Sequence, residues 1–146
     1  MSEVPSVIRS YVPSQDFNFI SNSWLEDYRR NSFFSHDIPN SIYYPNHTSV
    51  ITKLIERSSV LLIVNPSDQN QIYGYIVFEF FLGDLIIHWI HVKDKFRKFH
   101  LATKLLSSIT TPKETPIFAS HMTKITKSLI KTYKITYNPY LIFLEH

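Results

Sequence analysis

The sequence contains no cysteine and only two glycines among its 146 residues. Without cysteine, the chain can form neither a disulfide framework nor a thiolate metal site, and no cysteine can carry an acyl intermediate. Metal ligands would have to come from carboxylates and from the seven histidines, which are scattered along the chain. We therefore predict that the protein has no metal site.

Long apolar runs and clustered charges are absent as well. No apolar run approaches the length of a membrane span, and residues 1–12 contain neither a basic leader nor a long apolar segment. We expect a soluble, cytoplasmic protein that does not bind a membrane. The net charge of +3 is mild and the basic residues are dispersed, so nucleic-acid binding is not indicated. Only Phe96 and Phe99, beside a basic turn, could stack on bases, and inward packing explains them better.

The hydrophobic content of 44% gives a chain of this length enough apolar material for a substantial core. No composition shift or linker divides the sequence. We therefore expect one domain that spans residues 1–146.

The most informative stretch covers residues 85–109. Residues 85–92 are a nearly unbroken β-branched and aromatic run, which predicts a strand buried on both faces. Apolar residues then recur at helical spacing, so we predict a helix over residues 97–109 whose first turn carries Arg97, Lys98 and His100. Cations at the amino terminus of a helix oppose its dipole, and we therefore predict that an anion, most naturally a phosphate, binds there.

The remaining patterns place further strands and helices around this stretch. Expected strands cover residues 7–12, 60–64, 72–82, 117–120 and 140–144. One helix is expected to begin at Asp16, and others to cover residues 48–57 and 123–133. Residues 31–46, rich in Phe and Tyr, are expected to form a loop that covers a pocket. The order predicts an α/β fold of the α+β kind, with a mixed, mostly antiparallel sheet flanked by helices.

This order resembles the fold of the GCN5-related N-acetyltransferase (GNAT) superfamily. The signature of that family's pyrophosphate loop is Gln or Arg, two residues, Gly, one residue, and then Gly or Ala. The corresponding stretch here is Arg97-Lys98-Phe99-His100-Leu101-Ala102, in which Arg97 and Ala102 match and His100 replaces the first glycine. The chain is also similar to small acetyltransferase-like proteins encoded by bacteriophages, through residues 22–25, 71–77, 92–93 and 96–97.

The resemblance implies acetyl-CoA as the cofactor. By motif position, backbone N–H groups from Arg97 to Ala102 would hold the pyrophosphate, and Ile90, His91 and Val92 would lie beside the pantetheine arm. Glycine at the position of His100 would let the backbone approach the phosphate without a β-carbon. Histidine tolerates a positive φ better than most residues, and its ring can donate to a phosphate.

Acetyl transfer requires a neutral amine, a polarised thioester carbonyl and an acid for the leaving thiolate. The candidates are Glu79 as a base, His91 at the end of the central strand, and Tyr133 near the position where family members keep a tyrosine acid. Each candidate also has a structural interpretation. Glu79 would face the solvent edge or pair with a lysine, one of His88 and His91 would be a hydrogen-bonded core histidine, and Tyr133 would pack.

Two functions follow from these residues. The first is an acetyl-CoA-dependent N-acetyltransferase that acts by direct attack of a small amine or a protein amine. The second is a catalytically inactive GNAT-fold phage protein with a structural, virion-associated or host-interaction role, located in the host cytoplasm or the virion and bound to a phage or host protein. Arg97 and Ala102 favour the first function, whereas His100 and the aromatic loop favour the second.

Overall fold

The computed structural model of the chain describes residues 4–31, 37–110, 116–130 and 132–144. It contains one sheet of six strands whose spatial order equals their order in the chain. The first four strands are antiparallel neighbours, and β5 and β6 continue the sheet in parallel. The strands are β1 (Val7–Ser10), β2 (Ser59–Asn65), β3 (Asp68–Phe81), β4 (Asp84–Val92), β5 (Ile117–Ala119) and β6 (Ile135–Tyr137). The predicted mixed sheet is confirmed.

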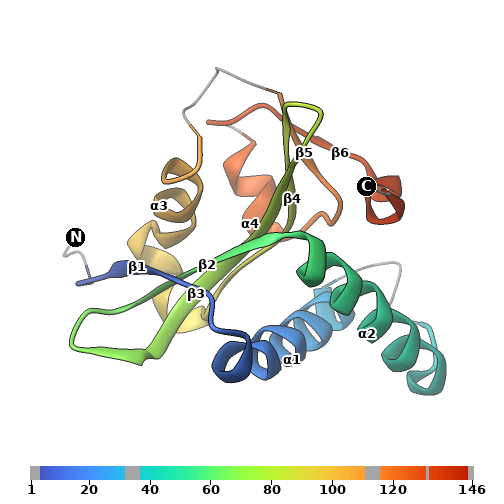
Figure 1. The fold of residues 1–146 in the computed structure, drawn as a ribbon, viewed down its shortest axis with the longest axis horizontal. Coiled ribbons are helices and arrows are strands. Elements are labelled where there is room, and N and C mark those ends of the chain that lie inside the picture. The colour runs from blue at the N-terminus through green and yellow to red at the C-terminus, as the bar shows by residue number, and fades with distance from the viewer. Residues whose placement is uncertain (1–3, 32–36, 111–115, 131, 145–146) are drawn as a thin grey trace.

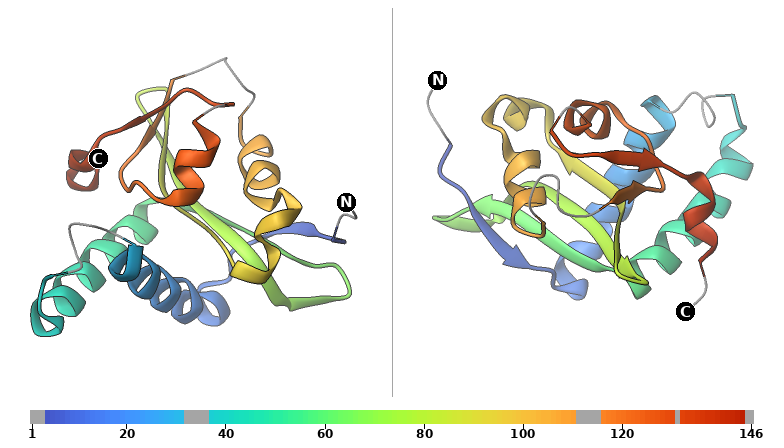
Figure 2. Two further views of the ribbon diagram at one scale, coloured as in Figure 1. Left: turned by 180° about the vertical axis from the view of Figure 1, so that it is seen from behind. Right: turned by 90° about the horizontal axis from the view of Figure 1, so that it is seen from above.

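Helices cover both faces of this sheet (Figures 1 and 2). On one face lie α1 (Pro13–Asn31) and α2 (Asn40–Arg57), which pack on side chains such as Leu62, Tyr75 and Val77. On the other face lie α3 (Leu101–Ser107) and α4 (Lys124–Leu129), which pack on the alternate side chains, among them Ile63 and Ile76. Because successive side chains of a strand point to opposite faces and both faces are covered, the central parts of β3 and β4 are largely apolar.

The predicted helix over residues 97–109 is wrong at its start. Residues Asp94–Phe99 form a 3-10 helix, η1, and the α-helix begins only at Leu101. His100 separates the two with φ 56° and ψ 30°, in the left-handed region, which a continuous α-helix cannot contain. Arg97 and His100 therefore precede α3, and they do not belong to its first turn.

The predicted loop over residues 31–46 is also wrong in part. Residues 40–46 are the first turns of α2, whereas residues 32–36 lie outside the described residues. Pro45 suggested a loop, but the helix contains it. Burial outweighs the hydrogen bond that proline removes, since Tyr43 is 3% exposed and donates its hydroxyl hydrogen to the carbonyl of Leu25 at 2.7 Å.

The carboxyl-terminal prediction is wrong as well. Residues 140–144 do not form the last strand: β6 comes earlier, and Pro139–Phe143 form a second 3-10 helix, η2. The side chain of Asn138 accepts the N–H of Tyr140 and begins this helix. Arg57 then donates to the carbonyls of Leu141 and Leu144, so these groups are satisfied without a sheet.

The predicted helix over residues 123–133 is shorter in the structure, where α4 ends at Leu129. Within the described ranges, no helix combines the length and the apolar character that crossing a membrane requires.

Candidate active site

The strands β4 and β5 separate at the centre of the sheet. Their parallel ladder runs from Leu85 with Ile117 to Ile87 with Ala119, and the N–H of Ser120 donates to the carbonyl of Ile87 at 3.1 Å. Beyond this point β4 continues to Val92, while the chain after β5 turns toward α4. A V-shaped opening results at the carboxyl ends of the two strands, the place where open α/β sheets bind ligands.

A β-bulge accompanies this separation. Val77 pairs with Trp89 and Phe78 pairs with Ile87, so His88 is an extra residue in β4. The bulge turns His88 toward the α1 and α2 face, where it contacts Glu79, and leaves Trp89 stacked on Trp24 of α1 with 5.3 Å between ring centroids. A local irregularity of β4 thus lies where the opening begins.

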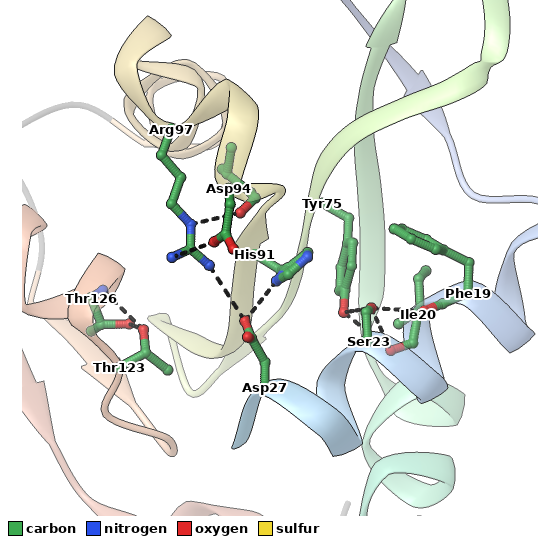
Figure 3. A network of polar contacts seen from close by, with 11 residues as sticks. Phe19, Ile20, Ser23, Asp27, Tyr75, His91, Asp94, Arg97, Thr123 and Thr126 are labelled. Carbon is green, nitrogen blue, oxygen red and sulfur yellow. Dashed lines mark hydrogen bonds and ion pairs between the residues drawn. The ribbon is translucent and has the colours of Figure 1, made fainter. Parts of the chain in front are cut away.

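Asp27 of α1 joins the end of β4 to the turn that follows it (Figure 3). Its Oδ2 atom lies 2.9 Å from Nδ1 of His91 and 3.6 Å from the guanidinium of Arg97. Burial raises the pKa of Asp27, but the hydrogen bond to His91 and the nearby arginine charges outweigh it, so the pKa lies below its ordinary value. Asp27 is therefore ionised at neutral pH.

Arg97 is not the uncompensated cation that the sequence predicted. Its Nε donates to the carbonyl of Val92 at 2.9 Å, and one terminal nitrogen lies 2.9 Å from Asp94 (Figure 3). The remaining contact, to Asp27, is the loose one at 3.6 Å. An anion at this turn would have to compete with two carboxylates for the guanidinium.

The predicted cofactor residues divide into buried side chains and a turn. Ile90, Val92 and Leu101 are at most 2% exposed and belong to the core, so only their backbone groups could face a ligand. Ala102 packs partly buried against the same core. His100 is exposed and takes the left-handed conformation that the glycine of the motif would adopt without strain. The side chains of Lys98 and Phe99 lie outside the described part of the structure.

A small cavity occupies the opening beside β4. It has a volume of about 20 Å³, and its walls are Trp89 and Ile90 of β4, Arg97, the α1 residues Asp27 and Tyr28, and residues 122–125. Small-molecule pockets measure roughly 300–1,000 Å³, and 20 Å³ holds about one water. A pantetheine arm fits here only if residues 122–125 move away from β4.

A larger pocket of about 540 Å³ lies on the α1 and α2 side of the opening. Its walls come from α2, from η2 and from the ends of β5 and β6, and Tyr28 lines both this pocket and the small cavity. None of the described lining residues carries a full charge, and most are apolar or aromatic: Tyr28, Ile38, Ile42, Tyr43, Asn46, His47, Val50, Ser120, His121, Tyr137, Pro139, Tyr140, Ile142 and Phe143. Four residues of the predicted pocket-covering segment line this pocket: Ile38, Ile42, Tyr43 and Asn46.

Glu79 is buried and forms contacts with two side chains. It is 5% exposed, and its Oε2 atom lies 2.9 Å from Nε of Arg57 and 2.5 Å from Nε2 of His88. The expectation of a solvent-facing glutamate is therefore wrong, and the expected ion pair exists with arginine in place of lysine. Burial raises the pKa of Glu79, but the hydrogen bonds from His88 and Arg57 lower it further, so Glu79 stays ionised.

His88 begins a line of polar contacts that no sequence pattern announced. Its Nδ1 lies 2.7 Å from Oγ of Ser120, and the same Oγ lies 2.9 Å from Nδ1 of His121. Nε2 of His121 then lies 3.4 Å from Nε2 of His47 in α2. Burial lowers the pKa of His47 to about 4, and burial and the neighbouring histidines lower that of His121 well below its ordinary value. Both rings are therefore neutral at pH 7.

The three predicted catalytic residues do not form one cluster. Glu79 pairs with Ile86 and His91 with Tyr75, at different levels of the same hairpin. Tyr133 is 1% exposed and packs into the core on the α3 and α4 face, while Glu79 contacts α2 on the opposite face. Within the described residues no group of three or more histidines, cysteines and carboxylates is arranged to hold a metal ion.

Comparison with known proteins identifies the fold of this chain. No protein-family model matches the sequence, and no curated protein matches it. A protein from Pyrococcus furiosus described as an acetyl transferase is 15% identical, has a TM-score of 0.55, and aligns over 94% of this chain and 88% of its own. A protein from Staphylococcus aureus assigned to the GNAT family of acetyltransferases is 17% identical, with a TM-score of 0.52 over 70% of this chain and 86% of its own. The chain has the GNAT fold.

These structural similarities show the fold of the chain and not its activity. A third structure is the GCN5-related glucosamine N-acetyltransferase region of a fungal multidomain β-N-acetylglucosaminidase. It is 13% identical with a TM-score of 0.50, and covers 74% of this chain but 12% of the fungal one. Against five further bacterial structures, this chain spans only 56–63% of their length. The predicted fold class is confirmed, and the activity is a separate question.

Proposed function

We propose that the protein is an acyl-CoA-dependent N-acyltransferase that transfers an acetyl group from acetyl-CoA to an amine. The observation that carries this proposal is the opening between β4 and β5, which has a turn with left-handed His100 at one end and a 540 Å³ pocket beside it. A thioester in the opening and an amine in the pocket would meet at the point where the strands separate.

The donor side uses backbone groups. In this proposal the N–H groups of the turn from Arg97 to Ala102 hold the pyrophosphate, and Ile90, His91 and Val92 flank the pantetheine arm. Arg97 would exchange its long contact to Asp27 for a phosphate oxygen, and its bond to Val92 would hold the guanidinium near the strand end. Residues 122–125 would move, because the present cavity of about 20 Å³ is too small.

The reaction is a direct displacement. Acetyl-CoA supplies a thioester carbon, the amine nitrogen forms the new C–N bond, and the C–S bond breaks. The chain must then accept the proton that the nitrogen loses and protonate the departing thiolate. We assign His91 a role beside the thioester and Glu79 a role in accepting the proton, and the acid role of Tyr133 stays a prediction.

A catalytically inactive GNAT-fold protein is the second candidate. Three observations favour it: the β-carbon of His100 at the glycine position, the pairing of Arg97 with Asp94, and the small cavity beside Ile90. In that case the protein would act through a phage or host protein. The bacteriophage source and the location in a host cytoplasm or virion stay predictions from the sequence.

Calorimetric titration with acetyl-CoA separates these candidates. We expect binding in the micromolar range for the wild type, and about tenfold weaker binding for Arg97→Ala, which is about 1.4 kcal/mol. Lys104→Ala is the matched control, because its ammonium lies on α3 and contacts Ser6, away from the opening. If the wild type shows neither heat nor a shift in melting temperature, the enzyme proposal is wrong and the inactive protein is favoured.

A further inference from the structure

The line of polar contacts that starts at Glu79 ends in the wall of the large pocket. Its members come from four separated parts of the chain: Glu79 of β3, His88 of β4, Ser120 and His121 after β5, and His47 of α2. Glu79, His88, Ser120 and His121 are each at most 5% exposed. Burying four of these polar side chains is costly unless every one of them is hydrogen-bonded, which is the case here.

One assignment of hydrogens satisfies all the contacts. Glu79 is an acceptor, so Nε2 of His88 donates to it, and in the neutral ring Nδ1 of His88 accepts from the hydroxyl of Ser120. Oγ of Ser120 then accepts from Nδ1 of His121. Nε2 of His121 is left as an acceptor, and Nε2 of His47 donates to it across 3.4 Å, the longest contact in the line. Every hydrogen therefore points toward Glu79.

The pocket end of this line is His47, which carries the remaining ring nitrogen. Its ring lies between Tyr28 and Tyr43, with centroid distances of 4.7 and 5.5 Å and nearly parallel planes. Both His47 and His121 line the 540 Å³ pocket. No hydrogen bond within the described residues engages Nδ1 of His47, so this nitrogen can accept a proton from a molecule in the pocket.

We propose that His47 is the catalytic base of the pocket, and that His121, Ser120 and His88 relay the acceptor's proton to Glu79. This inference rests on the proposed function and extends it. As the amine nitrogen forms its bond to the acyl carbon, its proton passes to Nδ1 of His47. Each hydrogen of the line then moves one step, and the proton that arrives at Glu79 neutralises its carboxylate. After the product leaves, the hydrogens move back along the line and His47 gives the proton to solvent.

Arg57 fixes the position of this end point. It holds Glu79 at 2.9 Å and also donates to the carbonyls of Leu141 and Leu144, in and beside η2. The residues of η2 form one wall of the pocket. Arg57 thus fixes both Glu79, which receives the proton, and the wall of the pocket that holds the amine. Glu79, His88 and Arg57 act through other groups, so they are positioning residues.

The first test reads the tautomers directly and does not need activity. Long-range ¹H–¹⁵N correlation spectra of the full chain should show His121 protonated at Nδ1 and His88 and His47 protonated at Nε2. In Ser120→Ala, the hydrogen-bonded Nδ1 proton signal of His121 should be lost. Ser108→Ala removes a hydroxyl that only bonds to the carbonyl of Leu105, and it should leave all histidine signals unchanged. A wild-type His121 protonated at Nε2 overturns the relay.

The second test is kinetic, with acetyl-CoA and an amine that the wild type acetylates. Ser120→Ala should lower kcat by about 100-fold, in the range of general acid–base contributions, with the Kd of acetyl-CoA changed less than about twofold. Glu79→Gln keeps a hydrogen-bond acceptor for His88 but takes up a proton poorly, so it should lower kcat while the tautomers persist. Wild-type kcat in both variants overturns the relay. A wild type that transfers nothing overturns the proposed function, and the tautomers still decide whether the line of hydrogens exists.

Discussion

Gly74 lies directly against His91 across the β3–β4 ladder: a β-carbon at Gly74 would be 2.4 Å from the carbonyl oxygen of His91. The same β-carbon would be 3.1 Å from the α-carbon of Val92. One of the two glycines of the chain thus stands where the end of β4 comes closest to its neighbour. The position of His91 and Val92 in the opening depends on this close approach.

Gly74→Ala should therefore destabilise the protein and displace the end of β4. Backbone atoms cannot yield as a flexible side chain can, and we expect a loss of about 1–3 kcal/mol in the free energy of unfolding, as for other overpacked sites. Urea denaturation measures this loss. Gly83→Asn is the comparison: nothing lies within 4 Å of its β-carbon position, so with φ 85° it reports backbone strain without overpacking, and asparagine tolerates such a backbone better than most residues. Equal stability of Gly74→Ala and the wild type would contradict the close approach.

His100→Gly should stabilise the protein and improve donor binding. A left-handed backbone costs a non-glycine residue about 1–2 kcal/mol, and the extra freedom of glycine in the unfolded chain offsets about 0.5–1 kcal/mol of the gain. Removal of the β-carbon also opens the turn to a phosphate. We expect a higher melting temperature and a lower Kd for acetyl-CoA by calorimetry. His100→Ala keeps the β-carbon and should show neither gain. Identical behaviour of the two variants would mean that the ring, and not the backbone, matters.

The stability that Asp16 provides should depend on pH. Asp16 accepts two hydrogen bonds from Arg9, at 2.8 and 2.9 Å, and one from the N–H of Val12 at 2.8 Å. Burial raises its pKa, but these bonds outweigh burial, and the folded-state pKa lies below the ordinary value. The stabilisation is therefore complete above about pH 4 and is lost as the pH falls through the folded-state pKa.

Asp16→Asn tests this dependence. At pH 7 we expect a loss of about 1.5–3 kcal/mol, as for hydrogen bonds to charged groups. The difference between variant and wild type should narrow as the pH falls from 5 to 2, and urea denaturation at several pH values measures it. Asp68→Asn, at the exposed first residue of β3 where the side chain bonds only to the N–H of Asn70, is the control and should change little. A difference that stays constant with pH would refute the assignment.

The pocket should favour an uncharged aromatic acceptor. Its described lining contains no charged residue to hold an ammonium group, and its histidines are neutral. Transfer of an unpaired ammonium from water into such a site costs several kcal/mol. We expect kcat/KM for aniline, neutral at pH 7, to exceed that for cyclohexylamine, a cation of similar shape, by at least about tenfold. Val50→Asp adds a carboxylate to the wall and should reverse the preference. A wild-type preference for cyclohexylamine would count against an uncharged acceptor.

Local patterns predicted the framework well. The apolar runs over residues 85–92 and 72–82 predicted two long strands; β4 has nearly the expected bounds, and β3 begins four residues earlier than expected, at Asp68. The helix expected to begin at Asp16 is present as α1, although it begins three residues earlier, at Pro13. Such elements are predictable because hydrophobic periodicity decides which faces are buried, and periodicity is visible in the sequence.

The site was less predictable. Glu79 and His88 stood out as polar residues inside apolar strands, and the structure explains both through one contact of 2.5 Å. Ser120, His121 and His47 gave no signal, since they come from segments that only the folded chain brings together. Arg97 suggested an unpaired cation, although Asp94, three positions before it, pairs with it at 2.9 Å; its second, longer contact is to Asp27 on α1, which only the fold brings near.

The sequence by itself determined which strands are buried on both faces, the order of the elements and the absence of thiol chemistry. Each of these depends on residue type and spacing along the chain. Tertiary structure decided where β4 and β5 separate, which conformation His100 takes, and which ions lie in contact. These features depend on the competition between backbone hydrogen bonds, burial and charge at points where distant segments meet. The line from Glu79 to His47 is of that kind: five ordinary residues become one connected group only after folding.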